Sequence, residues 1–365
     1  MRKALIISSG VLLLGVCCLL FGCGNLGYYL QSASGQLEIL SKRRPISELL
    51  ADTKTDAELK KRLRLALEIR EFASTEMGLP DNESYRSYAD LKRPYVVWNV
   101  VATPEFSLQP ETWCFPIVGC LPYRGYYHEA DAKEFAAGLE QAGLDTATYG
   151  VAAYSTLKWF SDPILNTFSG YSEEYLAGMI FHELAHQQVY IAGQADFNEA
   201  YAKTVERVGV ARWFEYKGDP EQAVRAARMQ AINREFVDLV MATRQVLQQL
   251  YRSGRAVETM RAEKSRVIKD FQNHLRKFRK QHKLTRGYDK WLAAELNNAL
   301  FASVSTYHEL GPAFEQLLVL KNNNLPAFHR EVARIARLDA NERKRVLEHL
   351  SSLYLAAQKE AGSNL

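Results

Sequence analysis

The sequence predicts an α+β fold that is mainly helical. β-Branched and aromatic residues concentrate between residues 95 and 157, with prolines and glycines between them. From residue 172 onward, nearly the whole chain shows helical periodicity and helix-start signals. A motif of two histidines at helical spacing opens that second part, at residues 182–186. We therefore expect a small sheet packed against the helix that carries this motif, followed by a long helical C-terminal region.

The first 22 residues have the layout of a bacterial secretory signal. A basic tripeptide precedes an apolar run from Ala4 to Phe21. The run ends at Cys23 in a sequence typical of a lipobox, where the signal is cut before a cysteine that becomes lipidated. An uncleaved membrane anchor is the alternative, because the run approaches spanning length. Both readings place the rest of the chain outside the cytoplasm, and Gly24 favours a lipoprotein of the outer membrane that faces the periplasm of a Gram-negative cell.

Removal of a signal would leave Cys23, Cys114 and Cys120. If Cys23 carries lipid, the other two form an even pair in an oxidising compartment. The loop between them is short but can be closed by a disulfide, which would stabilise the fold only modestly. Two buried free thiols are the alternative.

The chain divides into four expected regions. Residues 1–22 are the signal, residues 23–90 an N-terminal helical region, residues 91–218 the core with the histidine motif, and residues 219–365 a helical region packed on that core. The expected elements are helices over 56–77 and 131–142, a strand over 95–102, extended chain over 113–127, a strand over 146–157, a helix capped by Ser172, a helix from Asp219-Pro220 to about 251, a helix to about 283, and helices over 288–318 and 326–360.

Residues 255–286 are strongly basic. We interpret them as one arm of a solvated helical hairpin packed along an apolar stripe, and contact with anionic lipid or an acidic partner is the alternative. The net charge of the whole chain is only +4, and no nucleic-acid-binding signature accompanies it. We therefore expect no nucleic-acid partner. The sequence does not determine the oligomeric state.

The motif His182-Glu183-Leu-Ala-His186 carries the candidate chemistry. Residues four apart lie on one face of a helix, so both imidazoles can reach one ion. Neutral imidazole is a good zinc ligand, and a catalytic zinc needs a third protein ligand and an open position for water. Glu183 would act as the general base on that water.

Glu199, in Asn198-Glu-Ala-Tyr-Ala, is the expected third ligand. A short turn at Gly193 could fold its helix back against the histidines. Glu206 is the alternative ligand, or a carboxylate that orients a ligand histidine from outside the metal shell.

The two segments together resemble the gluzincin signature, in which H-E-x-x-H supplies two histidines and N-E on the next helix supplies a glutamate. The resemblance implies a zincin-like core, a Zn²⁺ cofactor and a peptide substrate. The connection between His186 and Glu199 is shorter than is usual in those peptidases.

The chain also resembles a family of bacterial lipoproteins labelled predicted aminopeptidases. The resemblance covers most of residues 23–320 and includes Gly27-Tyr-Tyr29, Gly119-Cys-Leu-Pro-Tyr-Arg-Gly125 and Trp159-Phe-Ser-Asp-Pro163. That label is itself inferred from the zinc motif. The G-x-M-E-N motif with which zinc aminopeptidases hold the substrate amine is absent from the sequence, so exopeptidase and endopeptidase activity both remain open.

Gluzincins bind extended substrate along a strand edge. The stretch from Gly150 to Ser155, with Gly150, Ala152 and Tyr154, is the candidate here, and an ordinary core strand is the alternative. A donor to the developing oxyanion is also needed. The candidates are Tyr307 and His308, on a later helix as in gluzincins, and Arg124, with Tyr123 and Tyr126, if the Cys114–Cys120 loop borders the cleft.

We therefore predict a zinc-dependent envelope peptidase, with His182, His186 and Glu199 as ligands. The competing hypothesis is a non-enzymatic, lipid-anchored envelope scaffold in which the metal is structural or absent. A stoichiometric zinc with an open water position would favour the enzyme.

Overall fold

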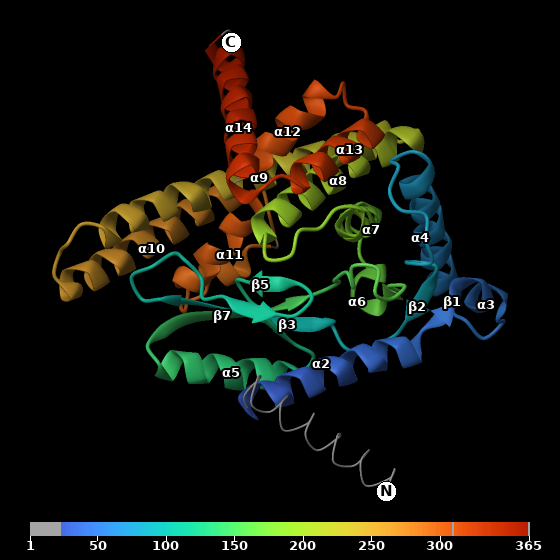
Figure 1. The fold of residues 1–365 in the computed structure, drawn as a ribbon, viewed down its shortest axis with the longest axis horizontal. Helices are drawn as coiled ribbons and strands as arrows, with labels where there is room; N and C mark the ends of the chain where they lie inside the picture. Colours follow the sequence, from blue (N-terminus) through green and yellow to red (C-terminus); the bar gives the residue numbers. More distant parts are fainter. Residues whose placement is uncertain (1–22, 286, 309, 364–365) are drawn as a thin grey trace, which may run out of the picture.

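The computed structural model describes residues 23–363 except residues 286 and 309, and this part of the chain is mainly helical, with small sheets (Figure 1). The prediction of a mainly helical α+β protein is therefore confirmed. The elements in chain order are α2 (Cys23–Lys42), β1 (Arg44–Pro45), α3 (Ile46–Ala51), α4 (Ala57–Thr75), β2 (Ser87–Ala89), β3 (Val97–Pro104), β4 (Trp113–Phe115), β5 (Gly119–Leu121), β6 (Arg124–Tyr126), α5 (Glu129–Gln141), β7 (Leu144–Val151), β8 (Ile164–Leu165), α6 (Asn166–Ser169), α7 (Glu173–Gln188), α8 (Ala195–Tyr216), α9 (Pro220–Tyr251), α10 (Val257–Gln281), a 3₁₀ helix η1 (Asp289–Leu292), α11 (Asn298–His308), α12 (Gly311–Leu320), α13 (Leu325–Ala336) and α14 (Ala340–Ser363).

The longest strands, β3 and β7, pair antiparallel in a sheet of order β6-β3-β7. Side chains alternate between the faces of a sheet. One face carries Val100 and Tyr126 and packs on α5. In Figure 1, α2 and α5 run beneath this sheet, and α11 also contacts β3 and β7. The expected strand over 146–157 ends earlier, at Val151.

The helix with the histidine motif, α7, packs against α4, α6 and α8, whereas the β6-β3-β7 sheet packs on α5 and α11. Helices therefore provide most of the surroundings of α7. A zincin-like core, with a sheet packed along the metal helix, stays a prediction.

One hydrophobic cluster joins the three regions expected after the signal. It contains Leu63 and Phe72 of α4, Phe181 of α7, Trp213 of α8 and Phe328 of α13, all buried. Burial of large apolar side chains is the main favourable contribution to folding. These three regions thus share a core.

A second cluster holds the long hairpin of α9 and α10 together. Leu247 of α9, Phe271 and Leu275 of α10 and Phe301 of α11 are buried in it. Gly254, with φ of +67°, forms the turn between the two helices. The two helices thus form a hairpin packed along an apolar stripe, and contact of its basic residues with anionic lipid or an acidic partner stays a prediction.

The expected signal, residues 1–22, lies outside the described residues. Cys23 is the first residue of α2, and its side chain also lies outside the description. From residue 23 to residue 363, none of the helices that the structure describes combines the length and the apolar character of a membrane span.

A buried arginine fixes the chain segment that follows α4. Arg70 is fully buried and donates to the carbonyl oxygens of Ser84 at 2.8 Å, Pro80 at 2.7 Å and Asn82 at 3.0 Å, and to the Ser74 hydroxyl. Charge-assisted hydrogen bonds are the stronger ones in proteins. The guanidinium therefore holds residues 80–84 in one conformation beside α7.

Arg70→Met is expected to lower the free energy of unfolding by about 3 kcal/mol, because the substitution removes the guanidinium donor from the buried Ser84 carbonyl and from the half-buried Pro80 carbonyl. Denaturant unfolding followed by circular dichroism measures this loss. Arg64→Met, at an exposed position of the same helix, is the control and should change stability by less than about 0.5 kcal/mol. Equal stabilities of the two variants would contradict the assigned role of Arg70.

Candidate metal centre

The helix α7 begins where the sequence predicts. The Ser172 hydroxyl accepts a hydrogen bond from the Tyr175 amide at 3.2 Å, and Glu173 and Glu174 occupy the first turn, where the helix dipole favours negative charge. From Leu176 to Gln187, all residues except Met179 are buried. A helix buried on all sides offers a rigid, dry support for polar side chains.

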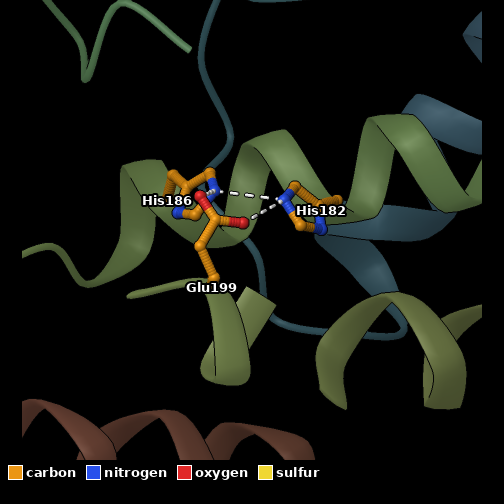
Figure 2. Close-up of side chains that lie close together, drawn as sticks. All are labelled: His182, His186 and Glu199. Carbon is orange, nitrogen blue, oxygen red and sulfur yellow. Dashed lines mark hydrogen bonds and ion pairs between the residues drawn. The ribbon is translucent and has the colours of Figure 1, made fainter. Parts of the chain in front are cut away.

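Two histidines of α7 and one glutamate of α8 converge in the interior (Figure 2). The Nε2 atoms of His182 and His186 lie 3.1 Å apart. The Glu199 carboxylate approaches both, at 3.3 Å from His182 Nε2 and 3.6 Å from His186 Nε2. One ligand atom from each of the three residues lies within 4.8 Å of the others, an arrangement that could hold a metal ion.

These three residues fit zinc. With zinc–nitrogen distances of about 2.0–2.1 Å, tetrahedral coordination separates two ligand nitrogens by about 3.3–3.4 Å, close to the separation of the two imidazoles. Two histidines and a carboxylate also leave one coordination position open, as catalytic zinc sites do.

Glu206 contacts His182 from the opposite side of the imidazole ring. Its carboxylate lies 2.9 Å from His182 Nδ1 and 2.8 Å from Lys203 Nζ. Gly178 of α7 leaves room for it, since a Cβ there would lie 3.3 Å from Glu206 Cγ. Of the two expected roles of Glu206, the geometry thus favours the orienting carboxylate over the ligand.

Burial and charge perturb the pKa values of the motif. Burial raises the pKa of Glu183 to about 8. Burial lowers the pKa of His186 to about 4. Burial would also lower the pKa of His182, but its hydrogen bonds to Glu199 and Glu206 outweigh this effect and raise it to about 10. The carboxylates thus favour a positive charge in this interior, whether it is a proton or a metal ion.

Asn198 explains how so short a connection brings Glu199 back to the histidines. Its side chain accepts from the Ile191 amide at 2.8 Å and donates to the Ile191 carbonyl at 2.8 Å. Gly193 turns the chain with φ of +73°. The side chain of Asn198 thereby fastens the connection to the first turn of α8. The sequence indicated Asn198 as part of the N-E pattern and, with Asp196, as a possible helix start, whereas its two hydrogen bonds to Ile191 were not predicted.

A buried polar network supports the end of α7. The Gln187 amide donates to Asp162 at 3.0 Å and accepts from Asn82 at 2.8 Å. Burial raises the pKa of Asp162 to about 6, although Thr156 also donates to it. The Trp159–Pro163 motif therefore supplies a buried carboxylate, Asp162, that binds Gln187, the residue after His186. Its place in this network was not predicted.

The stretch expected to bind substrate is only partly available for pairing with an extended peptide. Gly150 is on β7, an edge strand of its sheet, and the Tyr95 ring lies where a Cβ at Gly150 would be, at 2.2 Å. The Ala152 carbonyl already accepts from the Thr167 hydroxyl at 2.5 Å. The Tyr154 hydroxyl bonds that of Tyr127 at 2.6 Å. Of Gly150, Ala152 and Tyr154, only Gly150 lies within an edge strand.

The structure places Arg124 away from the histidines, contrary to its expected role. Arg124 pairs with Val100, so both side chains point to the sheet face that packs on α5. Its guanidinium lies 4.0 Å from the Tyr28 ring centre and 4.8 Å from that of Phe135. The alternation of side chains along β6 thus turns Arg124 toward α2 and α5. The side chains of Tyr307 and His308 lie outside the description.

Three tyrosines lie near Glu199, and two of them, Tyr149 and Tyr190, were not predicted. Burial and the charge of Glu199 raise the pKa of Tyr190 to about 12. The same two effects raise the pKa of Tyr149 to about 12, and that of Tyr123 well above its usual value. The spacing of Tyr190, four residues after His186, could have indicated its position.

Cys114 and Cys120 form a disulfide, as expected. They face each other across the β4–β5 pair.

Comparison with known proteins gives one family match. Residues 27–347 match the model of a family described as "Putative aminopeptidase". No significant match was found among curated proteins or among solved structures.

Proposed function

The chain belongs to the putative aminopeptidase family, and on that premise we propose that it is a zinc-dependent peptidase of the cell envelope. The observation that carries the proposal is the convergence of His182, His186 and Glu199 in the protein interior. Glu183 lies on the same buried helix as the two histidines, next to His182. This is the residue set that zinc-dependent hydrolysis of a peptide bond requires.

In this proposal His182, His186 and Glu199 hold zinc, which when bound supplies a Lewis acid that activates water. The Glu183 carboxylate accepts a proton from the attacking water as the carbon–oxygen bond forms. Glu183 then gives this proton to the amine that leaves as the carbon–nitrogen bond breaks. Burial raises the pKa of Glu183 in the metal-free protein, and a cation held beside it would favour the carboxylate form that accepts the proton.

Glu206 orients His182 in this scheme and leaves Nε2 directed at Glu199. Tyr307 and His308 remain proposed donors to the oxyanion. The phenols of Tyr123 and Tyr149 are further candidates for polar contacts with the peptide, because their raised pKa keeps them protonated as donors near Glu199.

We also propose that the protein is exported and lipidated at Cys23, in the outer membrane facing the periplasm. The N-terminal sequence supports this location, and a disulfide between Cys114 and Cys120 suits an oxidising compartment. Labelling of cells with a fatty acid should mark the wild type and leave a Cys23→Ser variant unmarked. Equal labelling of both would contradict lipidation at this residue.

Metal analysis and peptide hydrolysis test the activity. We expect one zinc per chain, and hydrolysis that a chelator removes and added zinc restores. Amino-acyl amides and N-blocked peptides distinguish the two modes: cleavage of only those with a free amine indicates an aminopeptidase, and cleavage of blocked peptides an endopeptidase. A protein that binds no metal and cleaves neither would instead support the envelope scaffold.

A further inference from the structure

The β4–β5 hairpin lies against the connection that joins the metal-ligand helices. Cys114 and Cys120 close this hairpin with a disulfide, and Val118 is near its tip. The carbonyl oxygen of Val118 accepts from the Gly193 amide at 2.9 Å and from the Tyr190 hydroxyl at 3.2 Å. One carbonyl of the hairpin thus binds two residues of the connection between His186 and Glu199.

The absence of a side chain at Gly119 permits this close approach. A Cβ at Gly119 would lie 2.4 Å from the Gly193 nitrogen and 2.8 Å from its Cα. These neighbours are backbone atoms, which cannot rotate away as a flexible side chain can. Gly119 also has φ of +77°, in the left-handed region that favours glycine. Any larger residue at position 119 must therefore push the hairpin and the connection apart.

The conformation of the connection determines where Glu199 lies. Asn198 holds both backbone groups of Ile191, and Glu199 is the next residue of α8. The connection is therefore fastened on one side by Asn198 and on the other by the hairpin. A surface connection without such contacts would sample several conformations. Ordering it only when metal binds would reduce the affinity for the metal.

We propose that the disulfide-closed hairpin, residues 113–121, is a positioning element that holds the connection in the conformation in which Glu199 meets the two histidines. This inference rests on the proposed function, because it takes zinc as the ion that the site binds. The hairpin touches no reacting atom in this role. The disulfide contributes by limiting the conformations of the hairpin itself, since it joins directly opposed residues of β4 and β5.

Gly119→Ala tests the contact, and Gly143→Ala is its matched control. Gly143 also has a positive φ, of +86°, but a Cβ there would meet nothing within 4 Å. Both variants carry the same kind of backbone strain, and only Gly119→Ala displaces the connection. We expect Gly119→Ala to bind zinc roughly ten- to a hundredfold more weakly, the usual loss for supporting residues around a metal, and Gly143→Ala to bind as the wild type does. Competition with a chromophoric chelator measures both affinities.

Hydrogen exchange in the metal-free protein provides the second readout. The Gly193 amide should exchange faster in Gly119→Ala and in the double variant Cys114→Ser/Cys120→Ser than in the wild type or in Gly143→Ala. The double variant should also bind zinc more weakly, whereas loss of so short a disulfide loop should lower the melting temperature in chelator only slightly. Equal zinc affinity of Gly119→Ala and Gly143→Ala, or unchanged exchange at Gly193, would overturn the inference.

The two readouts separate this inference from the proposed function. If the wild type binds no zinc, the proposed function fails, while exchange at Gly193 still decides whether the hairpin holds the connection. If the wild type binds zinc and cleaves peptides but the Gly119→Ala affinity is unchanged, the function stands and the positioning role is wrong.

Discussion

Glu183→Gln is expected to reduce peptide hydrolysis by about 10²–10⁴-fold, the usual contribution of a general base, while zinc binding is retained. Glutamine has nearly the same shape as glutamate and fits the same buried position of α7. Its amide cannot take a proton from water at neutral pH. Because His182, His186 and Glu199 are unchanged in this variant, the ligand set stays complete.

Turnover of a cleaved peptide and zinc content per chain must be measured on the same preparation. Glu173→Gln is the matched control on the same helix. The Glu173 carboxylate accepts from Trp213 Nε1 at 2.8 Å, and a glutamine oxygen can accept the same bond. The control should therefore keep both activity and stability. Hydrolysis by Glu183→Gln at the wild-type rate would exclude Glu183 as the general base.

The pH dependence of the metal-free protein provides a further check on the electrostatics of the centre. The pKa of His182 is raised to about 10 in the folded protein, above its unfolded value of about 6.5. Protonation of His182 therefore contributes stability that is fully present below about pH 6.5 and is lost as pH rises toward 10. His182→Gln should remove this part of the pH dependence in chelator, as measured by denaturant unfolding. An unchanged pH profile in that variant would show that other groups dominate.

Local signals in the sequence predicted much of the fold. The Ser172 cap and the Asp219-Pro220 start mark helix ends that the structure shows at the expected places. Cap and proline effects depend on neighbouring residues alone, so a single sequence reveals them. The stretches 288–318 and 326–360 are mainly helical, as expected, but the breaks within them were not predicted. Near Gly311 and Pro312 and near Leu338 the chain turns to form α11 to α14 instead.

The metal centre was less predictable where tertiary contacts determine the position of a residue. Helical spacing places His182 and His186 on one face, and the N-E pattern indicates Glu199. Which face of a sheet a residue occupies depends on register, however, so sequence reasoning placed Arg124 near the cleft whereas pairing with Val100 turns it toward α5. The contact of the hairpin with Gly193 joins segments far apart in the chain, and no local pattern reveals it.

Glu199 and Glu206 contact different nitrogens of His182, and this difference leads to the second large expected effect. Glu199 faces Nε2, the nitrogen directed at the second histidine, whereas Glu206 faces Nδ1. Glu199→Gln removes an anionic ligand, so its zinc affinity should fall well beyond the roughly 10–100-fold loss typical of an outer carboxylate. Glu206→Gln should show only that smaller loss, because its amide oxygen can still accept a hydrogen bond from His182 Nδ1.

The comparison of the two variants is informative because both remove one negative charge from the same centre. A loss caused only by the net charge would be similar in the two, and more salt would reduce it in both. A loss caused by direct coordination would be far larger in Glu199→Gln, and salt would leave the difference between the variants in place. Chelator competition at two salt concentrations separates these cases. If Glu206→Gln lost more zinc affinity than Glu199→Gln, the assignment would reverse, and Glu206 would become the third ligand despite its contact with the outer nitrogen of His182.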